Sequence, residues 1–298
     1  MNIAPRIIGR LPAQLLATAA GLRRRHRLIE RLSACVVSGL RNRDVVIRVG
    51  AAKGLVLNTG EYNLNYLLPF AEPDVSAALK TVLAAGMTFY DIGANVGFYT
   101  ILGARIVGAG GTVASFEPLQ HNRELVEHNV RANGFSNVQC LPYAVGEYDG
   151  VEKFMLSEGH SWGMLAGQGH TPMKFAGEIV VGVRNLSGLV NSGDLKPPHV
   201  IKMDVEGGEA AVLRGAIEVI ATYRPILFIE LHDTTTAVLS ELERQGYHTS
   251  LFGSTMPVKA VEGNLHIAAV PSEQADRDFL LSRLQSSSFP RCGRCAHI

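Results

Sequence analysis

The 298-residue chain contains no apolar run that approaches the ~20 residues needed to cross a bilayer as a helix. Its best candidate, "LPAQLLATAAGL" at residues 11–22, is too short. The arginines that follow it place positive charge on the wrong side for a signal peptide. We therefore expect no transmembrane segment and a cytoplasmic protein.

Cysteine is scarce as well. Four cysteines in a chain of this length do not form the disulfide framework of a secreted protein. Cys35 and Cys140 stand alone in apolar surroundings and are predicted to be core thiols. Cys292 and Cys295 have C-x-x-C spacing with His297 nearby, but no second pair completes the four ligands of a zinc knuckle. We expect a tail without a structural metal site.

Charge is also low, at 18% of residues with a net charge of +1, so nothing indicates a nucleic-acid partner. The exception is residues 1–43, where nine arginines face a single acid, Glu30. One interpretation is a solvated helical extension, and the other is a helix that makes weak contact with a membrane surface or a partner. The first is favoured because "LPAQLLATAAGL" has few bulky anchors.

From residue 87 onward, short apolar runs alternate with segments of helical spacing. Strands are expected at 87–93, 112–118, 137–146, 199–207, 225–232, 247–252 and 264–270, and helices at 96–107, 119–134, 208–223 and 234–246. This alternation predicts an α/β fold with a mostly parallel sheet covered by helices on both faces. The last two strands have no helix between them, which indicates an antiparallel pair at one edge.

The alternation is interrupted after the third strand. Residues 151–157 and 177–186 are predicted to be strands of an inserted hairpin. The loop between them contains His160, Trp162 and His170, and we expect it to line the substrate side. The predicted domain spans residues 51–271, preceded by the basic extension 1–50 and followed by the tail 272–298.

A glycine loop follows the first of these strands, and it lacks the third glycine of the dinucleotide fingerprint. That fingerprint, G-x-G-x-x-G, sets a pyrophosphate on a helix N-terminus. Here Gly93 and Gly97 form G-x-x-x-G, and Asp91 precedes them. A carboxylate there would repel a pyrophosphate but suits S-adenosylmethionine, whose sulfonium and ammonium are cationic. Glu117 ends the next strand, where an acid can accept hydrogen bonds from both ribose hydroxyls.

Four stretches together resemble one family: "FYDIGANVGFYTILGA", "FEP", "AVG" and "IKMDVEGGEAAVLRGA". They resemble the FkbM-type S-adenosylmethionine-dependent methyltransferases over roughly residues 60–270. The resemblance implies a class I methyltransferase fold with a Rossmann-like seven-stranded sheet. It also implies O-methylation, often of sugar or polyketide hydroxyls. The cofactor-binding residues it implies are Asp91, Gly93, Asn95, Gly97, Glu117 and Ala144.

Candidate catalytic residues follow the fourth and fifth strands. Period-2 alternation places Lys202 and Asp204 on one face, and Glu230 and His232 on another shared face. With a reference pKa near 6.5, His232 suits proton removal from an acceptor hydroxyl at neutral pH. Alternatively, Asp204 and Glu230 with His232 resemble the layout that holds Mg²⁺ in magnesium-dependent O-methyltransferases. Both mechanisms stay open.

Two of the acids in this region have a structural interpretation instead of a catalytic one. The fold as a whole is also compatible with functions other than methyl transfer. Glu206 and Glu209 can cap the helix that follows them. An NAD(P)-dependent oxidoreductase on a similar sheet, or a catalytically silent binding protein, would share the architecture. We expect a small-molecule or glycan acceptor, which the sequence does not name.

Overall fold

The computed structural model describes residues 40–61, 73–158, 162–167, 175–261, 263–274, 278 and 280–282. Its main element is a seven-stranded sheet with the order β12-β13-β11-β10-β3-β4-β5. The strands are β3 (Thr88–Ile92), β4 (Thr112–Phe116), β5 (Val138–Leu141), β10 (Val200–Met203), β11 (Ile226–Leu231), β12 (Tyr247–Leu251) and β13 (Leu265–Pro271). All neighbours are parallel except β13, which runs antiparallel to both β11 and β12. The predicted sheet and its antiparallel edge are confirmed.

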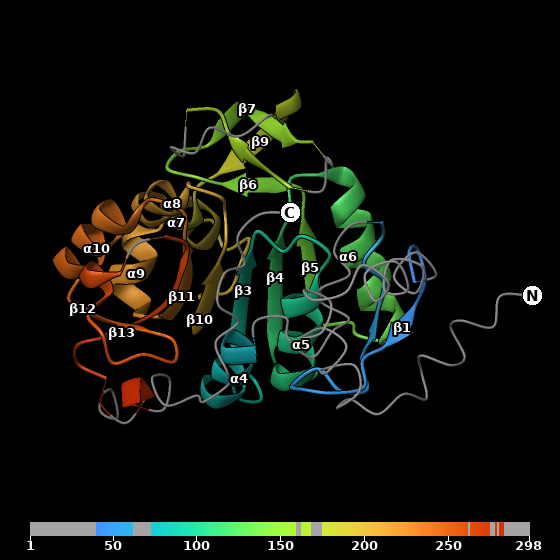
Figure 1. Ribbon diagram of the computed structural model, residues 1–298, viewed down its shortest axis with the longest axis horizontal. Helices are drawn as coiled ribbons and strands as arrows, with labels where there is room; N and C mark the ends of the chain where they lie inside the picture. Colours follow the sequence, from blue (N-terminus) through green and yellow to red (C-terminus); the bar gives the residue numbers. More distant parts are fainter. Residues whose placement is uncertain are drawn as a thin grey trace, which may run out of the picture.

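Helices cover both faces of this sheet (Figure 1). They are α4 (Pro73–Val82), α5 (Phe98–Val107), α6 (Gln120–Ala132), α7 (Leu186–Asn191), α8 (Glu209–Gly215), α9 (Ile217–Tyr223) and α10 (Thr235–Arg244), with a short 3₁₀ helix at Val258–Ala260. Successive strand residues alternate between two apolar clusters. Phe89 packs with Val75 of α4 and Ile101 of α5, whereas Tyr90 shares a cluster with Val212 and Val219. Burial on both faces explains why β3 is apolar along most of its length.

Two predicted elements are divided in the structure. The expected strand 137–146 is two strands, β5 and β6 (Tyr143–Val145), which belong to different sheets. Pro142 lies between them and has no N–H to continue the ladder. The expected helix 208–223 is divided into α8 and α9 after Gly215. A Cβ at Gly215 would lie 2.0 Å from the carbonyl oxygen of Gly146, so the helix approaches the β6 loop more closely than a larger residue would allow.

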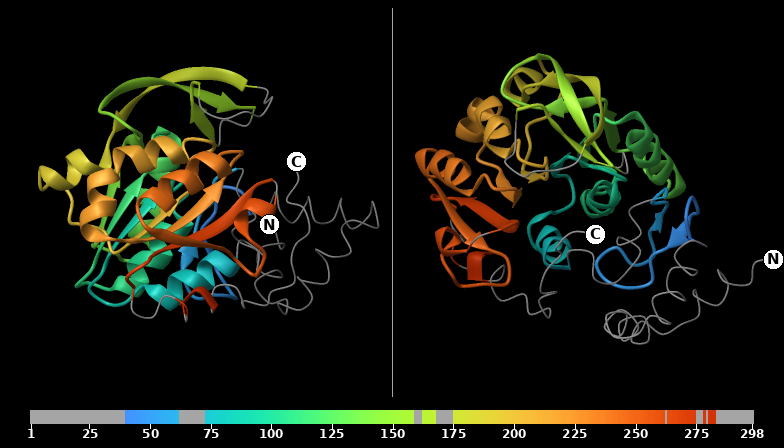
Figure 2. Two further views of the ribbon diagram at one scale, coloured as in Figure 1. Left: turned by 90° about the vertical axis from the view of Figure 1, so that its left-hand side faces the viewer. Right: turned by 45° about the horizontal axis from the view of Figure 1, so that its top comes forward.

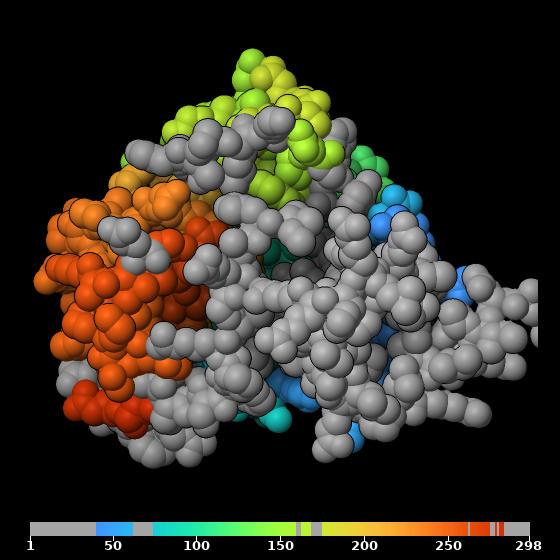
Figure 3. Space-filling view, in the orientation of Figure 1, coloured from blue at the N-terminus to red at the C-terminus, as the bar shows by residue number. Residues whose placement is uncertain are grey.

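A second sheet, with the order β6-β9-β7-β8, stands over one end of the main sheet (Figures 1 and 2). Its antiparallel pair β7 (Gly150–Ser157) and β9 (Phe175–Arg184) is the predicted hairpin. Strand β8 (Gly163–Leu165) lies where a loop was expected. The space-filling view shows a hollow beneath the yellow-green second sheet, with teal residues at its floor (Figure 3). His160 and His170 fall outside the described residues.

The hairpin of β1 (Val45–Val46) and β2 (Val56–Leu57) is held to α6 by a buried asparagine. Asn129 accepts a hydrogen bond from the Asn58 N–H at 2.7 Å and donates to the carbonyls of Asn58 and Val96 at 2.9 and 2.8 Å. These bonds fix α6 against the glycine loop. Neither β1 nor β2 belongs to the main sheet.

Several predictions on the flanking segments lie outside the described residues, including the arginine-rich residues before position 40 and Cys35, Cys292 and Cys295.

Cys140 is a free thiol, half-buried against the cluster around α5, where burial raises its pKa to about 11. Among the helices of the described ranges, none combines the length and the apolar character that a membrane span requires.

Candidate active site

Two glycines shape the loop at the carboxyl end of β3. Gly93 has a φ of +77°, and a Cβ there would lie 1.8 Å from the Asp204 carbonyl oxygen. Only glycine lets the β3 and β10 loops approach this closely. Gly97 has a φ of +83°, and its Cβ would lie 3.1 Å from Val126 of α6. Gly97 therefore serves the contact between α5 and α6, and it is not among the residues that line the pocket described below.

Glu117 is fixed by the backbone on both of its carboxylate oxygens. Oε2 accepts a hydrogen bond from the Asn95 N–H at 2.8 Å, and Oε1 accepts one from the Leu119 N–H at 2.9 Å. The side chain is buried, and burial raises its pKa to about 7 despite these two bonds. A carboxylate held in this way is preorganised to accept hydrogen bonds from a ligand.

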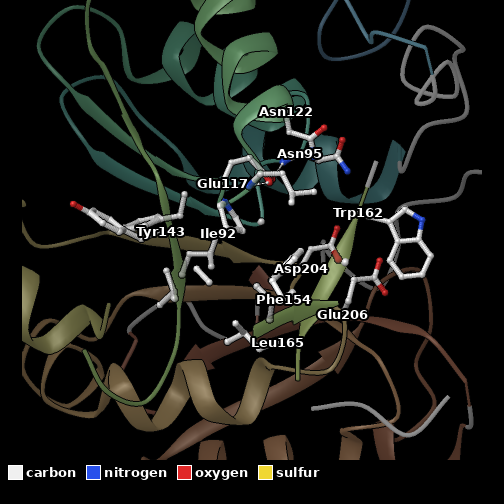
Figure 4. Close-up of a pocket in the computed structure, with 18 residues that line it drawn as sticks. Ile92, Asn95, Glu117, Asn122, Tyr143, Phe154, Trp162, Leu165, Asp204 and Glu206 are labelled. Atoms are coloured by element: carbon white, nitrogen blue, oxygen red, sulfur yellow. Dashed lines mark hydrogen bonds between the residues drawn. The ribbon is translucent and has the colours of Figure 1, made fainter. Parts of the chain in front are cut away.

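The main pocket lies between the carboxyl ends of the main-sheet strands and the second sheet, and it contains about 640 Å³ of space free of protein atoms, including solvent at its mouth. Asn95, Glu117 and Asn122 lie along one side, with Phe154 and Leu165 opposite (Figure 4). Tyr143 marks one end, and the other end is formed by Asp204, Glu206 and Trp162. Six residues predicted from the sequence line this pocket: Gly93, Asn95, Glu117, Ala144, Trp162 and Asp204. Leu119, Asn122 and Val205 line it too, and no sequence pattern had singled them out.

Asp91 does not line the pocket but lies beneath it, fully buried. Its Oδ2 accepts a hydrogen bond from the Thr100 hydroxyl at 2.6 Å. Its Oδ1 lies 4.0 Å from Nζ of Lys202, the residue opposite it in the parallel register of β3 and β10. Lys202 is itself buried, lies 3.3 Å from Asp204 Oδ2 and sits over the Tyr99 ring at 5.1 Å. One lysine thus links the carboxylate below the glycine loop to the carboxylate at the pocket end.

His232 lies among four carboxylates. Its Nδ1 is 2.9 Å from Glu209 Oε1, and its Nε2 is 3.5 Å from Glu206 Oε2, 3.6 Å from Glu230 Oε1 and 3.9 Å from Asp204 Oδ1. Burial alone would lower the pKa of His232, but these acids outweigh it and raise the pKa to about 10. In this arrangement the ring is an imidazolium at neutral pH and has no lone pair with which to accept a proton.

Glu209 is the fully buried anchor of this cluster. Its Oε1 accepts from the Gly207 N–H at 3.0 Å and its Oε2 from the Thr234 hydroxyl at 2.7 Å. Glu209 therefore supports the backbone just before α8, as its capping interpretation suggested, and also orients His232. Glu206 shows no such bond to the helix and instead lines the pocket, with a positive φ of 52°. Burial, and then the charge of Asp204, raises the pKa of Glu206 to about 7.

His266 is a member of the cluster that sequence reasoning missed. It lies opposite Glu230 in the antiparallel register of β11 and β13, and its Nε2 is 3.0 Å from Glu230 Oε2. Burial would raise the pKa of Glu230, but the bond and charge of His266, with the charges of His232 and Lys202, outweigh it and lower the pKa. Only knowledge of the strand pairing could have found this partner.

The predicted metal ligands are brought together. Ligand atoms of Asp204, Glu230 and His232 all lie within 4.8 Å of one another. Carboxylate oxygens suit Mg²⁺, and an imidazole nitrogen extends the fit to transition metals such as Mn²⁺. These three side chains therefore offer donor types that a divalent cation accepts.

Comparison with known proteins agrees with this geometry. The family model described as the methyltransferase FkbM domain matches residues 91–249. The hexuronic acid methyltransferase AglP of Haloferax volcanii is 28% identical over 162 residues, which make up 54% of this chain and 62% of that protein. The match thus spans less than two thirds of the relative's length.

Two solved structures are among those similar to the chain. The FkbM methyltransferase of Methylobacillus flagellatus shares 18% identity with a TM-score of 0.43, covering 69% of this chain and 52% of that one. A SAM-dependent O-methyltransferase of Thermotoga maritima shares 12% identity with a TM-score of 0.42, covering 78% and 87%.

The matched segment begins at Asp91, ends within β12 and covers more than half of the chain. It includes the glycine loop, Glu117, His232 and all four carboxylates around it. The chain therefore belongs to the FkbM methyltransferase domain family.

Proposed function

We propose that the protein transfers a methyl group from S-adenosylmethionine to a hydroxyl oxygen of a sugar or glycan. The observation that carries the cofactor assignment is Glu117, a buried carboxylate that two backbone N–H groups aim at an open pocket. A ribose presents two adjacent hydroxyls to such a group. The FkbM domain match and the name of the hexuronic acid methyltransferase relative support a sugar acceptor.

The pocket suggests how the cofactor lies. Glu117 would hold the ribose, Leu119 and Ala144 would line the adenine side, and Gly93 would lie along the methionine. Asp204 and Glu206 would then lie toward the sulfonium. Because Asp91 is buried below the loop, its charge acts through Lys202 and Thr100 instead of by direct contact. We therefore propose, from the lining of the pocket, that the cofactor-binding residues predicted from the sequence contribute to binding, with Asp91 acting indirectly.

Methyl transfer needs the acceptor oxygen in line with the sulfonium methyl group. The O–CH₃ bond forms as the S–CH₃ bond breaks, and the hydroxyl proton must leave. His232 can accept that proton only if it first becomes neutral, which its four acidic neighbours oppose. As an imidazolium it instead holds Asp204, Glu206 and Glu230 in place around its Nε2.

A divalent cation is the alternative source of activation. Asp204, Glu230 and His232 would hold it, and it would supply Lewis acidity toward a hydroxyl bound beside it. The proton on His232 would then be lost, because imidazole binds metals in its neutral form. Mg²⁺ or Mn²⁺ at this position is part of the proposal.

Isothermal titration with S-adenosylhomocysteine and with NADH tests the cofactor. We expect binding of the first alone, and we expect Glu117→Ala to weaken it by ~1.5–3 kcal/mol, the range for hydrogen bonds to a charged group. Circular dichroism checks that the variant is folded. Binding of NADH in place of S-adenosylhomocysteine would support an oxidoreductase and overturn the proposal. Methylated products from a glycan and nucleotide-sugar screen, read by mass spectrometry, test the reaction itself.

Two treatments separate the routes to activation. If His232 is the base, His232→Ala should reduce turnover by roughly 10²–10⁴ and chelation should have no effect. If a cation is bound, chelator should abolish activity, and added Mn²⁺ should raise the melting temperature of the native protein but not of Asp204→Asn. Full activity in both treatments would contradict both routes. Catalysis would then depend only on positioning the acceptor oxygen against the methyl group.

A further inference from the structure

Trp162 lines the pocket, and its backbone is bonded to β7. Its carbonyl oxygen accepts a hydrogen bond from the Ser157 N–H at 3.0 Å, which joins it to the end of β7. Gly163 follows, and a Cβ there would lie 2.2 Å from the Met155 carbonyl oxygen and 2.5 Å from the Phe154 ring. The Trp162 carbonyl and the residue that follows it are therefore packed closely against β7.

The indole lies at a defined place in the pocket. It is half-exposed and lines the same end of the pocket as Asp204 and Glu206 (Figure 4). Tyr143 marks the opposite end, and Glu117 lies between the two ends along one side. If the ribose bound Glu117 and the adenine lay toward Ala144, the transferred methyl group would lie toward the pocket end that Trp162 lines.

We propose that Trp162 is the platform on which the ring of a sugar acceptor stacks, an inference that rests on the proposed function. One face of a pyranose consists largely of C–H groups, which pack against an aromatic surface. Hydroxyls surround the edge of the same ring and donate to carboxylates. The indole offers an aromatic surface, and Asp204 and Glu206 at the same end of the pocket offer carboxylates. Together they match a polyhydroxylated ring better than a flat apolar ring or an open polyol.

Trp162 is the only tryptophan in the sequence, so its fluorescence reports on this pocket wall alone. The full chain, saturated with S-adenosylhomocysteine, is titrated with the methyl pyranosides of glucose, galactose, mannose, rhamnose and glucuronic acid. Sorbitol, an open-chain polyol, is the control. We expect a saturable change in emission with at least one pyranoside and none with sorbitol. A response to S-adenosylhomocysteine but to no pyranoside would assign the indole to the cofactor and overturn the proposal.

Kinetics test the same role for the pyranoside that is methylated fastest. Trp162→Ala should raise its KM roughly tenfold or more, the scale of an aromatic stacking contact, with kcat and the S-adenosylhomocysteine Kd within about threefold. Trp162→Phe keeps an aromatic ring and should restore most of the affinity. Tyr148→Ala is the matched control, because Tyr148 is a 54% exposed aromatic residue next to the same sheet but outside this pocket.

An unchanged KM in Trp162→Ala would overturn the platform, and so would a KM that Trp162→Phe fails to restore. Methylation of none of the pyranosides by a protein that binds S-adenosylhomocysteine would also overturn it. Failure of the proposed cofactor assignment looks different, because the native chain would then not bind S-adenosylhomocysteine at all.

Discussion

Replacing Glu117 by glutamine should stabilise the folded protein even as it removes the proposed ribose acceptor. Burial raises the pKa of Glu117 from 4.5 to about 7. Between these two values the unfolded chain loses its proton before the folded chain does, so stability falls as pH rises. The stabilising contribution of the protonated side chain is complete below pH 4.5 and is lost by about pH 7.

The size of the effect follows from the two pKa values. At about 1.36 kcal/mol for each pH unit, the ionised side chain costs the apo protein about 3 kcal/mol at pH 8 and about 1 kcal/mol at pH 5. Glutamine is uncharged at every pH and resembles the protonated acid, with one oxygen left to accept from the Asn95 or Leu119 N–H. The advantage of the variant should therefore grow by about 2 kcal/mol over this range.

Urea denaturation of the native protein and of Glu117→Gln, in the absence of cofactor and at several pH values from 5 to 8, measures this difference. Glu124→Gln, an exposed change on the neighbouring helix α6, controls for the loss of one negative charge. A difference in unfolding free energy that is flat across this range would refute the reasoning. Titration calorimetry adds a second check: at pH 6 the native protein should release a proton on binding S-adenosylhomocysteine, and the variant should bind weakly without release.

The glycine loop and its lysine yield two further predictions. Gly93→Ala should cost more than about 3 kcal/mol or prevent folding, because its Cβ would meet the Asp204 carbonyl, whereas Gly86→Ala, at a similar φ in open space, should cost about 1–2 kcal/mol. Comparable melting temperatures for the two would contradict the close approach. Lys202→Met leaves Asp91 and Asp204 without their shared cation and should destabilise by about 3–5 kcal/mol at pH 8. The loss should shrink as the carboxylates take up protons at lower pH, and a pH-independent loss would indicate a packing defect instead.

That the proposed cofactor-binding residues gather at one edge of the sheet could be predicted, because it depends on local sequence. Asp91, Gly93 and Glu117 follow apolar strands, and the carboxyl ends of parallel strands meet at one edge of a sheet. Their spacing along the chain therefore determines that they gather. The sequence could not show how deeply each side chain is buried. Asp91 is one residue too early in β3 to reach the pocket, and it lies buried under the glycine loop.

The catalytic side depends on contacts that no local pattern records. His266 reaches Glu230 only through the register of β11 and β13. The pKa of His232 depends on acids from two separate segments, residues 204–209 and β11, so a value near 6.5, reasonable for an isolated histidine, becomes about 10. Pro142 was a local signal that the expected strand ends, but the apolar residues on either side of it obscured the change of sheet.

The second sheet leaves the main body and returns to it at the same place. Val145 pairs with Arg184, and the N–H of Gly146 donates to the Arg184 carbonyl at 3.1 Å, so the start and end of the excursion are clamped side by side. A segment whose two ends lie side by side can be exchanged as a unit, because the exchange adds no loop-closure entropy cost to the surrounding chain. A chimera that takes residues 147–182 from another FkbM-domain protein should keep its affinity for S-adenosylhomocysteine and acquire the donor's acceptor preference. Acceptor range can thus diverge between relatives by transplantation of one contiguous stretch, while the strands that hold the cofactor stay unchanged.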